Sequence, residues 1–275
     1  MAQLAEGNPI GDYLRFLAVL ARAQQKASAT VMTAPIDGEA IRRANEHGMP
    51  LLQAASQIDP AWQGVLDGLL AAVQGDAGLP AALAPVFQRL GALAPEARDL
   101  LARRVLVGML TEPDDLAAAP IIVAALQVVF ADQASRLNEA EVPYAEPATV
   151  CPVCGTPPAV SVLRIGGREA GLRYLHCGTC CTEWHMVRVK CSHCESTKGV
   201  CYQSVQDSGD VVVAETCNQC HTYRKMVNQE KDPLAEPLAD DLATLMLDLL
   251  MGETDFARAT MNPLLPMSEG AASSP

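Results

Sequence analysis

The residues of this 275-residue chain that are best suited to bind a metal ion are its ten cysteines, all of which lie between Cys151 and Cys220. Eight of them form four Cys-x-x-Cys pairs, and the pattern Cys-x2-Cys-x22-Cys-x2-Cys occurs twice, with the second copy 40 residues after the first. Because each pair delivers two thiolates to one ion, this spacing predicts two tetrahedral four-cysteine sites. The predicted ligands are Cys151, Cys154, Cys177 and Cys180 in the first site, and Cys191, Cys194, Cys217 and Cys220 in the second.

Other uses of these eight cysteines are weighed against the tandem arrangement. In a cross-braced arrangement, Cys151 and Cys154 would share an ion with Cys191 and Cys194, but the 40-residue repeat favours two units that are each complete. Disulfides are disfavoured because no secretory signal is recognisable, and a thioredoxin-like redox pair lacks its βαβ context. Four thiolates suit both zinc and iron, so the ligands alone leave the metal open.

The remaining thiols and the histidines of this region are not needed as ligands. Cys181 adjoins Cys180 and is interpreted as a spare thiol, with a substitute ligand or a reactive thiol as the weaker alternatives. Cys201 is interpreted as a small core residue on a strand. Since each set of four cysteines is complete, the histidines are interpreted as packing or supporting groups, and neither ion has an open position for a catalytic water. These histidines are His176, His185, His193 and His221.

A hairpin pattern lies between the two pairs of each unit and explains how the pairs meet. Gly155 follows the first pair and is suited to a left-handed turn, whereas Glu195 stands at the matching place of the second unit, where we expect the turn to differ. A hairpin that returns one pair beside the other is the arrangement of a zinc ribbon or a rubredoxin-like knuckle. The predicted strands are Ala159–Ile165 and Leu172–His176 around Gly166-Gly167, and Gly199–Val205 and Val211–Ala214 around residues 207–210.

Most of the remaining chain is predicted to be helical. Apolar residues make up 49% of the chain and aromatic residues 4%, so Ala, Leu and Val must build most of the core. Apolar residues recur at helical spacing after capping residues, as they do after Asp59-Pro60. Helices are predicted near residues 12–29, 37–47, 60–75, 81–91, 96–110, 119–138 and 233–251.

Together these elements predict an α+β chain with an all-helical N-terminal domain, two tandem rubredoxin-like or zinc-ribbon four-cysteine units and a C-terminal helix. The linker is placed where two prolines interrupt the helical period. The predicted boundaries are 1–140 for the helical domain, 141–150 for the linker, 151–190 and 191–230 for the two units, and 231–275 for the C-terminal helix and tail.

Charge and hydropathy argue against several classes of function. With 20 basic and 32 acidic residues, the net charge of −12 opposes a phosphate-binding surface, so a nucleic-acid-binding zinc ribbon is the weakest alternative and no nucleic-acid partner is expected.

The longest apolar stretch, residues 117–131, falls short of the roughly 20 residues of a membrane-spanning helix, and the N-terminus shows no signal peptide. We therefore predict no membrane insertion and a cytoplasmic location. No Walker loop, nucleophile elbow, dinucleotide-binding loop or His-Glu-x-x-His motif is present, which favours a protein that is not an enzyme.

Several short blocks of sequence carry a family resemblance. They are Asn8-Pro-Ile-Gly-Asp-Tyr-Leu-Arg-Phe-Leu near the start, Gly171-Leu-Arg-Tyr-Leu-His-Cys177, Glu183-Trp-His and Val187-Arg-Val-Lys-Cys191 among the cysteines, and Lys231-Asp-Pro, Ala239-Asp-Asp-Leu-Ala, Phe256-Ala-Arg and Asn262-Pro in the tail. With the four cysteine pairs, they resemble the family of the formate dehydrogenase accessory protein FdhE over nearly the whole chain. Two departures are expected: the chain lacks part of the family's N-terminal stretch, and Cys181 stands where a different residue is expected.

The resemblance implies a cytoplasmic accessory factor that is required for active formate dehydrogenases. It further implies that the chain binds iron through rubredoxin-like motifs, with the eight paired cysteines as ligands, and that it interacts with the catalytic subunit of the dehydrogenase. A redox-active electron-transfer protein is the alternative, and it requires iron rather than zinc. The oligomeric state stays open.

Overall fold

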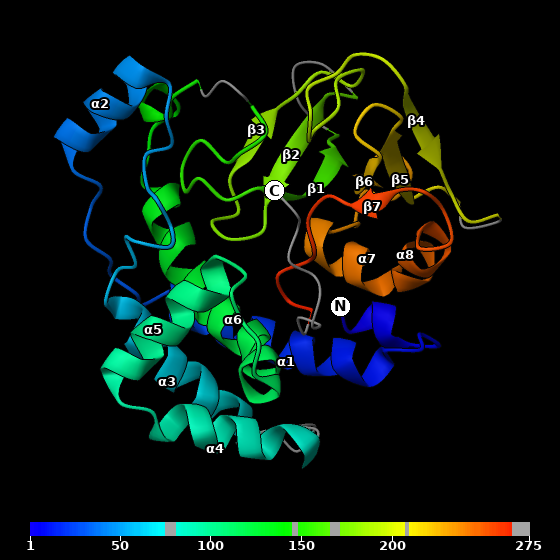
Figure 1. The fold of residues 1–275 in the computed structure, drawn as a ribbon. Coiled ribbons are helices and arrows are strands. Elements are labelled where there is room, and N and C mark those ends of the chain that lie inside the picture. The colour runs from blue at the N-terminus through cyan, green and yellow to red at the C-terminus, as the bar shows by residue number, and fades with distance from the viewer. Residues whose placement is uncertain (75–80, 145–147, 166–170, 207–208, 266–275) are drawn as a thin grey trace.

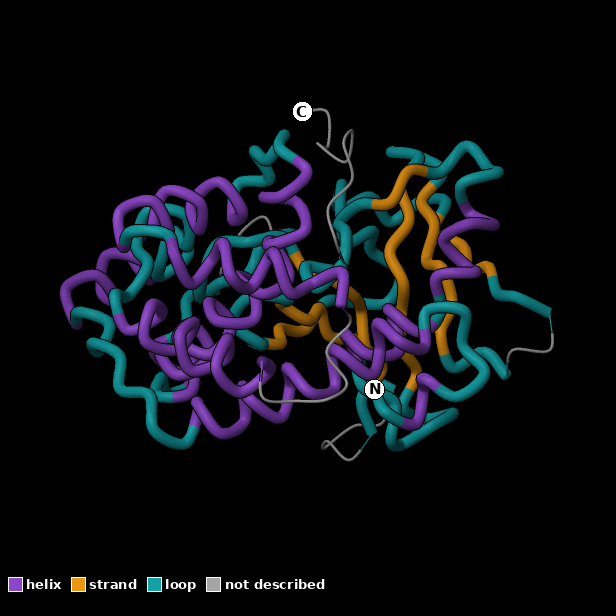
Figure 2. The backbone as a smooth tube through the Cα atoms, turned by 90° about the horizontal axis from the view of Figure 1, so that it is seen from below, coloured by secondary structure: helices purple, strands orange, loops and turns teal. Residues whose placement is uncertain are grey.

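The computed structural model of the protein places a helical half beside a half that is built on a β-sheet (Figure 1). It describes residues 1–74, 81–144, 148–165, 171–206 and 209–265. Figure 2 shows the strands gathered toward one side of the molecule and most of the helices toward the other. The predicted α+β class and the helical N-terminal region are thereby confirmed.

Proline and glycine residues mark several ends of the N-terminal helices. They are α1 Gly11–Ser28, α2 Gly38–His47, α3 Ala61–Gln74, α4 Ala84–Ala92, α5 Pro95–Leu106 and α6 Pro113–Ser135, with short 3-10 turns η1 Gln3–Ala5, η2 Ala81–Leu83 and η3 Glu139–Glu141. Both α5 and α6 start with proline, whose missing N–H costs no hydrogen bond in the first turn, and Gly48 ends α2 with a φ of 61°. The predicted start of α6 at 119 was wrong, because Pro120 lies inside this helix without ending it.

Helix α6 forms the centre of the helical half. It is apolar on all sides, and every residue from Ala118 to Phe130 is buried. Helices α1, α3, α4 and α5 pack around it. Among the described residues it is the one helix long and apolar enough to cross a bilayer, but 83% of its most apolar stretch is buried inside the protein. Such a helix is typical of a protein core.

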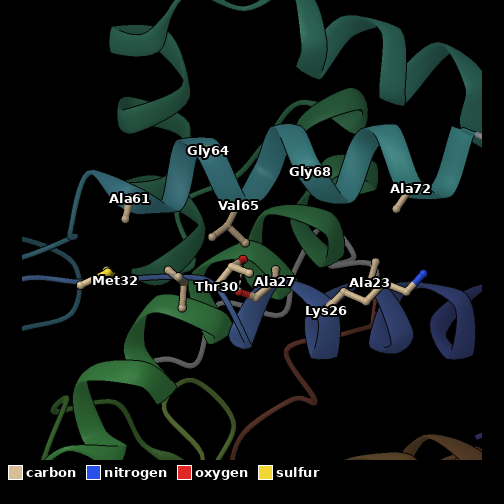
Figure 3. A pocket seen from close by; sticks show the side chains of 11 residues that line it. Ala23, Lys26, Ala27, Thr30, Met32, Ala61, Gly64, Val65, Gly68 and Ala72 are labelled. Atoms are coloured by element: carbon tan, nitrogen blue, oxygen red, sulfur yellow. Dashed lines mark hydrogen bonds between the residues drawn. The ribbon is translucent and has the colours of Figure 1, made fainter.

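A groove of about 450 Å³ runs between α1 and α3 (Figure 3). Small and apolar residues line most of it, and Lys26 is the one ionisable residue among those that the structure places in its lining. Gly64 and Gly68 of α3 face the groove, and the missing side chains at these positions leave its space open. The lining therefore offers neither an acid–base pair nor a set of metal ligands.

The cysteine region folds into one sheet rather than two separate ones. The strands are β1 Pro158–Leu163, β2 Arg173–Cys177, β3 Glu183–His185, β4 Val200–Gln203, β5 Val212–Cys217, β6 Thr222–Asn228 and β7 Ala257–Arg258. Their order is β3-β2-β1-β6-β5-β4, and β7 pairs with β6. Each cysteine unit contributes three consecutive antiparallel strands, and parallel pairing of β1 with β6 joins the two units.

Both predicted hairpins are confirmed, as β1 with β2 and β4 with β5. Of their expected turn residues, 166–167 and 207–210, residues 166–167 and 207–208 lie outside the described residues. The third strand of each unit, β3 or β6, was not predicted. Strand β6 contains Arg224 and Lys225, which sequence alone assigns to the surface but which are both buried.

The segment predicted as one helix over 233–251 instead forms two, α7 Pro237–Ala243 and α8 Leu245–Met251. The break lies at Thr244, whose hydroxyl donates to the carbonyl oxygens of Asp240 and Asp241 at 2.7 and 3.2 Å. Lys225 Nζ on β6 also donates to the carbonyl oxygens of Asp241 and Thr244. These donors satisfy the carbonyl groups that the break leaves without helical partners.

A buried charge network holds α7 and α8 on the sheet. Lys225 Nζ lies 3.5 Å from Asp241 Oδ1 and 2.5 Å from Asp248 Oδ2. Arg258 on β7 donates to the same two carboxylates at 2.5 and 2.8 Å. Burial alone would raise the pKa of Asp241, but the charges of Arg258 and Lys225 outweigh burial and hold that pKa below its ordinary value.

We expect Asp241→Asn to lower the free energy of unfolding by about 3–5 kcal/mol, because it leaves two buried cations with Asp248 alone. The pKa of Asp241 is lowered by folding, so its contribution is complete above the ordinary carboxyl pKa of about 4 and is lost as the pH falls through the lowered value. Urea unfolding should therefore show a large difference from the wild type at pH 7 and a smaller one at pH 3. Asp12→Asn, at an exposed ion pair, is the control. Equal midpoints for Asp241→Asn and the wild type at pH 7 would contradict the assignment.

Candidate metal centre

The first set of four cysteines forms a compact buried cluster. The sulfur atoms of Cys151, Cys154, Cys177 and Cys180 all lie within 4.8 Å of one another. Cys151 Sγ is 3.4 Å from Cys180 Sγ, and Cys154 Sγ is 3.4 Å from Cys177 Sγ. A tetrahedral ion with metal–sulfur bonds of about 2.3 Å separates its sulfurs by roughly 3.8 Å, so this cluster is close to the size that such an ion requires.

The second set repeats this arrangement. The sulfur atoms of Cys191, Cys194, Cys217 and Cys220 also lie within 4.8 Å of one another. The distance is 3.8 Å both between Cys191 Sγ and Cys220 Sγ and between Cys194 Sγ and Cys217 Sγ. Each tetrad is made within its own unit, so the tandem arrangement is confirmed and the cross-braced alternative was wrong.

All four Cys-x-x-Cys turns end in the same way, with one residue in the left-handed conformation. Its N–H donates to the carbonyl oxygen of the first cysteine of the turn, at 2.9 to 3.2 Å. These residues are Gly155, Cys181, Glu195 and His221, with φ of 76°, 60°, 60° and 53°. The expectation that the turn at Glu195 differs was therefore wrong, because the hydrogen bonds of the knuckle impose the conformation even without glycine.

Hydroxyl groups two residues after a cysteine pair contact the sulfurs. Thr156, Thr182 and Thr222 each place Oγ1 3.1 Å from the sulfur of the second cysteine of their pair. Sequence reasoning missed these contacts, although the pattern Cys-x-x-Cys-x-Thr/Ser occurs four times. Ser196 occupies the fourth place, but its hydroxyl bonds with Lys198 instead. Groups that hydrogen-bond to ligands orient them and tune the bound metal.

Backbone N–H groups also point at sulfur in both tetrads. Cys177 Sγ accepts from the N–H groups of Thr179 and Cys180 at 3.3 and 3.4 Å, and Cys217 Sγ accepts from that of Gln219 at 3.4 Å. Burial would raise the pKa of Cys177 and of Cys217, but hydrogen bonds from backbone and neighbouring thiols hold both values below the ordinary thiol pKa. Thiolate is the form that binds a metal ion, so these hydrogen bonds favour the metal-binding form of the two thiols.

None of the histidines that the structure describes belongs to either tetrad, as predicted. His176 Nδ1 instead lies 2.9 Å from Glu183 Oε1, and the ring of His221 stacks on Phe256 with centroids 6.1 Å apart. Cys181 also lies outside the tetrads and is exposed. The interpretation of Cys201 as a core residue was wrong, because it is exposed on the edge strand β4.

The first tetrad lies where the helical half meets the sheet. Its four cysteines belong to the same buried cluster as the core residues of α1, α3 and α6. Gln127 of α6 donates to the carbonyl oxygen of Gly178 at 2.7 Å. The N–H groups of residues 51, 52 and 54 donate to the carbonyl oxygens of residues 152, 153 and 154 at 2.8 to 3.1 Å. These hydrogen bonds attach the helical half to the turns of the first tetrad and fix the position of the site.

Comparison with known proteins agrees with a helical N-terminal part followed by two four-cysteine units. Family models match three consecutive parts of the chain: "FdhE, N-terminal" over residues 1–146, "FdhE, central domain" over 150–188 and "FdhE, C-terminal domain" over 189–265. The chain belongs to the FdhE family. The two tetrads thus fall in the central and C-terminal FdhE regions, one in each.

Individual FdhE proteins are similar to this chain along most of its length. "Protein FdhE homolog" of Pseudomonas aeruginosa is 42% identical, with 96% of this chain and 87% of that protein covered. The corresponding protein of Cronobacter sakazakii is 40% identical, with 98% and 87% covered. The crystal structure of the FdhE protein from Pseudomonas aeruginosa superimposes with a TM-score of 0.84 at 39% identity, covering 96% of this chain and 92% of that one.

We expect Thr156→Val to weaken binding of Zn²⁺ at the first tetrad by about 10- to 100-fold, because it removes the hydroxyl that contacts Cys154 Sγ and Cys177 Sγ. Refolding of the metal-free chain in chelator-buffered Zn²⁺ measures the affinity of both sites. Ser196→Ala is the matched control, since its hydroxyl bonds with Lys198 rather than with sulfur. Equal Zn²⁺ affinities for Thr156→Val and the wild type would show that this hydroxyl does not support the site.

Proposed function

We propose that the chain is a cytoplasmic accessory factor that is required for formate dehydrogenase activity and acts on the catalytic subunit of that enzyme during its maturation. The observation that carries this proposal is the pair of complete four-sulfur sites in a chain that matches FdhE models along nearly its whole length. The eight paired cysteines are the metal ligands in this proposal. The resemblance to the formate dehydrogenase accessory family supports both the partner and the role.

A role without catalysis of its own fits the two sites. Each tetrad already supplies the four ligands of a tetrahedral ion, so a bound ion would keep no position for substrate or for an activated water. The groove between α1 and α3 brings no acid–base pair among its described residues. Binding and positioning of the partner are therefore the activities that these features support.

We propose iron as the metal of both sites, with zinc as the alternative. Both ions suit four thiolates in tetrahedral geometry, and the resemblance to rubredoxin-like family motifs favours iron. Electron transfer is the second candidate function. The hydrogen bonds to sulfur and the exposed ligand Cys194 favour it, because both features influence the reduction potential of an iron–thiolate site.

The partner and the metal are tested on separate preparations. The immobilised 275-residue chain should capture the native catalytic subunit of formate dehydrogenase from an anaerobic extract, and the subunit should be identified by mass spectrometry. Failure to capture it, under conditions in which other accessory factors of that enzyme are captured, would overturn the proposed partner.

Metal analysis of anaerobically purified chain should give about two iron ions per chain, with visible sulfur-to-iron charge-transfer bands. The reason is that each tetrad holds one ion by itself. Stoichiometric zinc without visible bands would exclude iron and with it the electron-transfer alternative. A double variant, Cys151→Ser with Cys191→Ser, is the control that should lose the bound metal.

A further inference from the structure

We infer that the two metal sites are unequal: the first keeps its ion for as long as the chain is folded, whereas the second exchanges its ion with chelating ligands in solution. This inference rests on the proposed metal binding at the two tetrads. It assigns a structural role to one site and an exchange role to the other.

The cysteines of the two tetrads differ in exposure. Cys151, Cys154, Cys177 and Cys180 are all buried, with none more than 2% exposed. In the second tetrad, Cys194 is exposed and Cys220 half-buried, while Cys191 and Cys217 are buried. An ion in the second site would therefore be accessible from the side of Cys194, whereas an ion in the first site would be bound by four buried sulfurs.

The residues between the paired cysteines show the same contrast. In the first unit these residues are Pro152, Val153, Gly178 and Thr179, and all four are buried. In the second unit His193, Asn218 and Gln219 are exposed, and only Ser192 is buried. A methyl group at Gly178 would lie 2.8 Å from the side chain of Pro263, so the C-terminal segment closes directly over this knuckle.

The first site is also held by more bonds. Gln127 Nε2 of α6 donates to the carbonyl oxygen of Gly178. The N–H groups of residues 51, 52 and 54 donate to the carbonyl oxygens of residues 152–154 in the first Cys-x-x-Cys turn. Both of its turns place a threonine hydroxyl on sulfur, at Thr156 and Thr182. In the second site only Thr222 does so. Opening the first site would require the helical half to separate from the sheet, a change comparable to unfolding of the core.

The second site permits exchange without such opening. An incoming chelator could bind an ion held there while Cys194 is released as a thiolate, which would take up a proton from the buffer with no change of oxidation state. Cys194 is exposed and follows the exposed His193, so it has room to leave the ion. The other three cysteines of the second tetrad would hold the ion until the incoming chelator replaced them in turn.

The test measures metal release from the full chain loaded with two equivalents of Zn²⁺ under anaerobic conditions. After excess 4-(2-pyridylazo)resorcinol is added, we expect one ion to leave at least about 100-fold faster than the other, because only the first site depends on opening of the core. Circular dichroism should show that the chain stays folded after the fast phase. Release of both ions in one phase would overturn the inference, whereas a chain that binds no Zn²⁺ would overturn the proposed metal sites as well.

Two matched variants assign the phases. Cys194→Ser and Cys154→Ser replace the second cysteine of the first pair in each unit. We expect Cys194→Ser to abolish or further accelerate the fast phase, to leave the slow phase unchanged and to keep the thermal midpoint close to that of the wild type. Cys154→Ser should lower the midpoint strongly, because its site is part of the core. A slow phase altered by Cys194→Ser, with an unaltered fast phase, would overturn the assignment.

Alkylation of the wild-type chain keeps the test independent of variants that fail to fold. With chelator and iodoacetamide present, mass spectrometry should show the four cysteines of the second tetrad modified well before those of the first. The exposed Cys201, which lies outside both tetrads, serves as the internal standard for a thiol without metal. Equal labelling rates for the two tetrads would contradict the inference.

Discussion

The structure depends on four sulfurs, those of Cys151, Cys154, Cys177 and Cys180, converging where the helical half meets the sheet. A four-cysteine unit is too small to bury much apolar surface by itself. Here the first unit shares the core of a much larger helical assembly, and Gln127 and the backbone of residues 51–54 bond directly to its knuckles. An ion at this point would therefore connect the stability of the sheet to that of the helices.

The second unit has the same Cys-x-x-Cys turns as the first and lies on the other half of the sheet. Its turns end in left-handed residues and its sulfurs accept N–H groups as in the first unit, because the geometry of a Cys-x-x-Cys turn is local. Its surroundings differ, since no helix of the N-terminal half belongs to the clusters around its described strands. The repeated unit thus gives two sites with the same ligands in very different environments.

Buried arginines place the start of the second unit against the sheet. The guanidinium of Arg173 lies 2.7 Å from Glu215 Oε1 and donates to the carbonyl oxygen of Lys190 at 2.7 Å, and Arg224 donates to Ser192 Oγ at 2.9 Å. Burial raises the pKa of Glu215, and the charge of Arg173 offsets only part of this effect. Buried pairs of this kind add little net stability but penalise any arrangement in which one partner is left alone.

Several features followed from the sequence because they are local. The spacing of the cysteines determined both tetrads, since a tetrahedral ion accepts only sulfurs that short turns can bring together, and apolar periodicity located most helices to within a few residues. The hydroxyl contacts are also local, because each comes from a threonine two residues after a cysteine pair.

Only the tertiary structure decided which tetrad is buried, how β1 and β6 join the two units, and where the C-terminal helix breaks. Each of these outcomes depends on partners that are distant in sequence. They are α6 for the first tetrad, β6 for the pairing of β1, and Lys225 for the break at Thr244. A lysine or arginine is assigned to the surface unless its carboxylate partner is known. The carboxylate partner is brought close only by folding. The spacing of neighbouring residues therefore does not predict that such a charged side chain is buried.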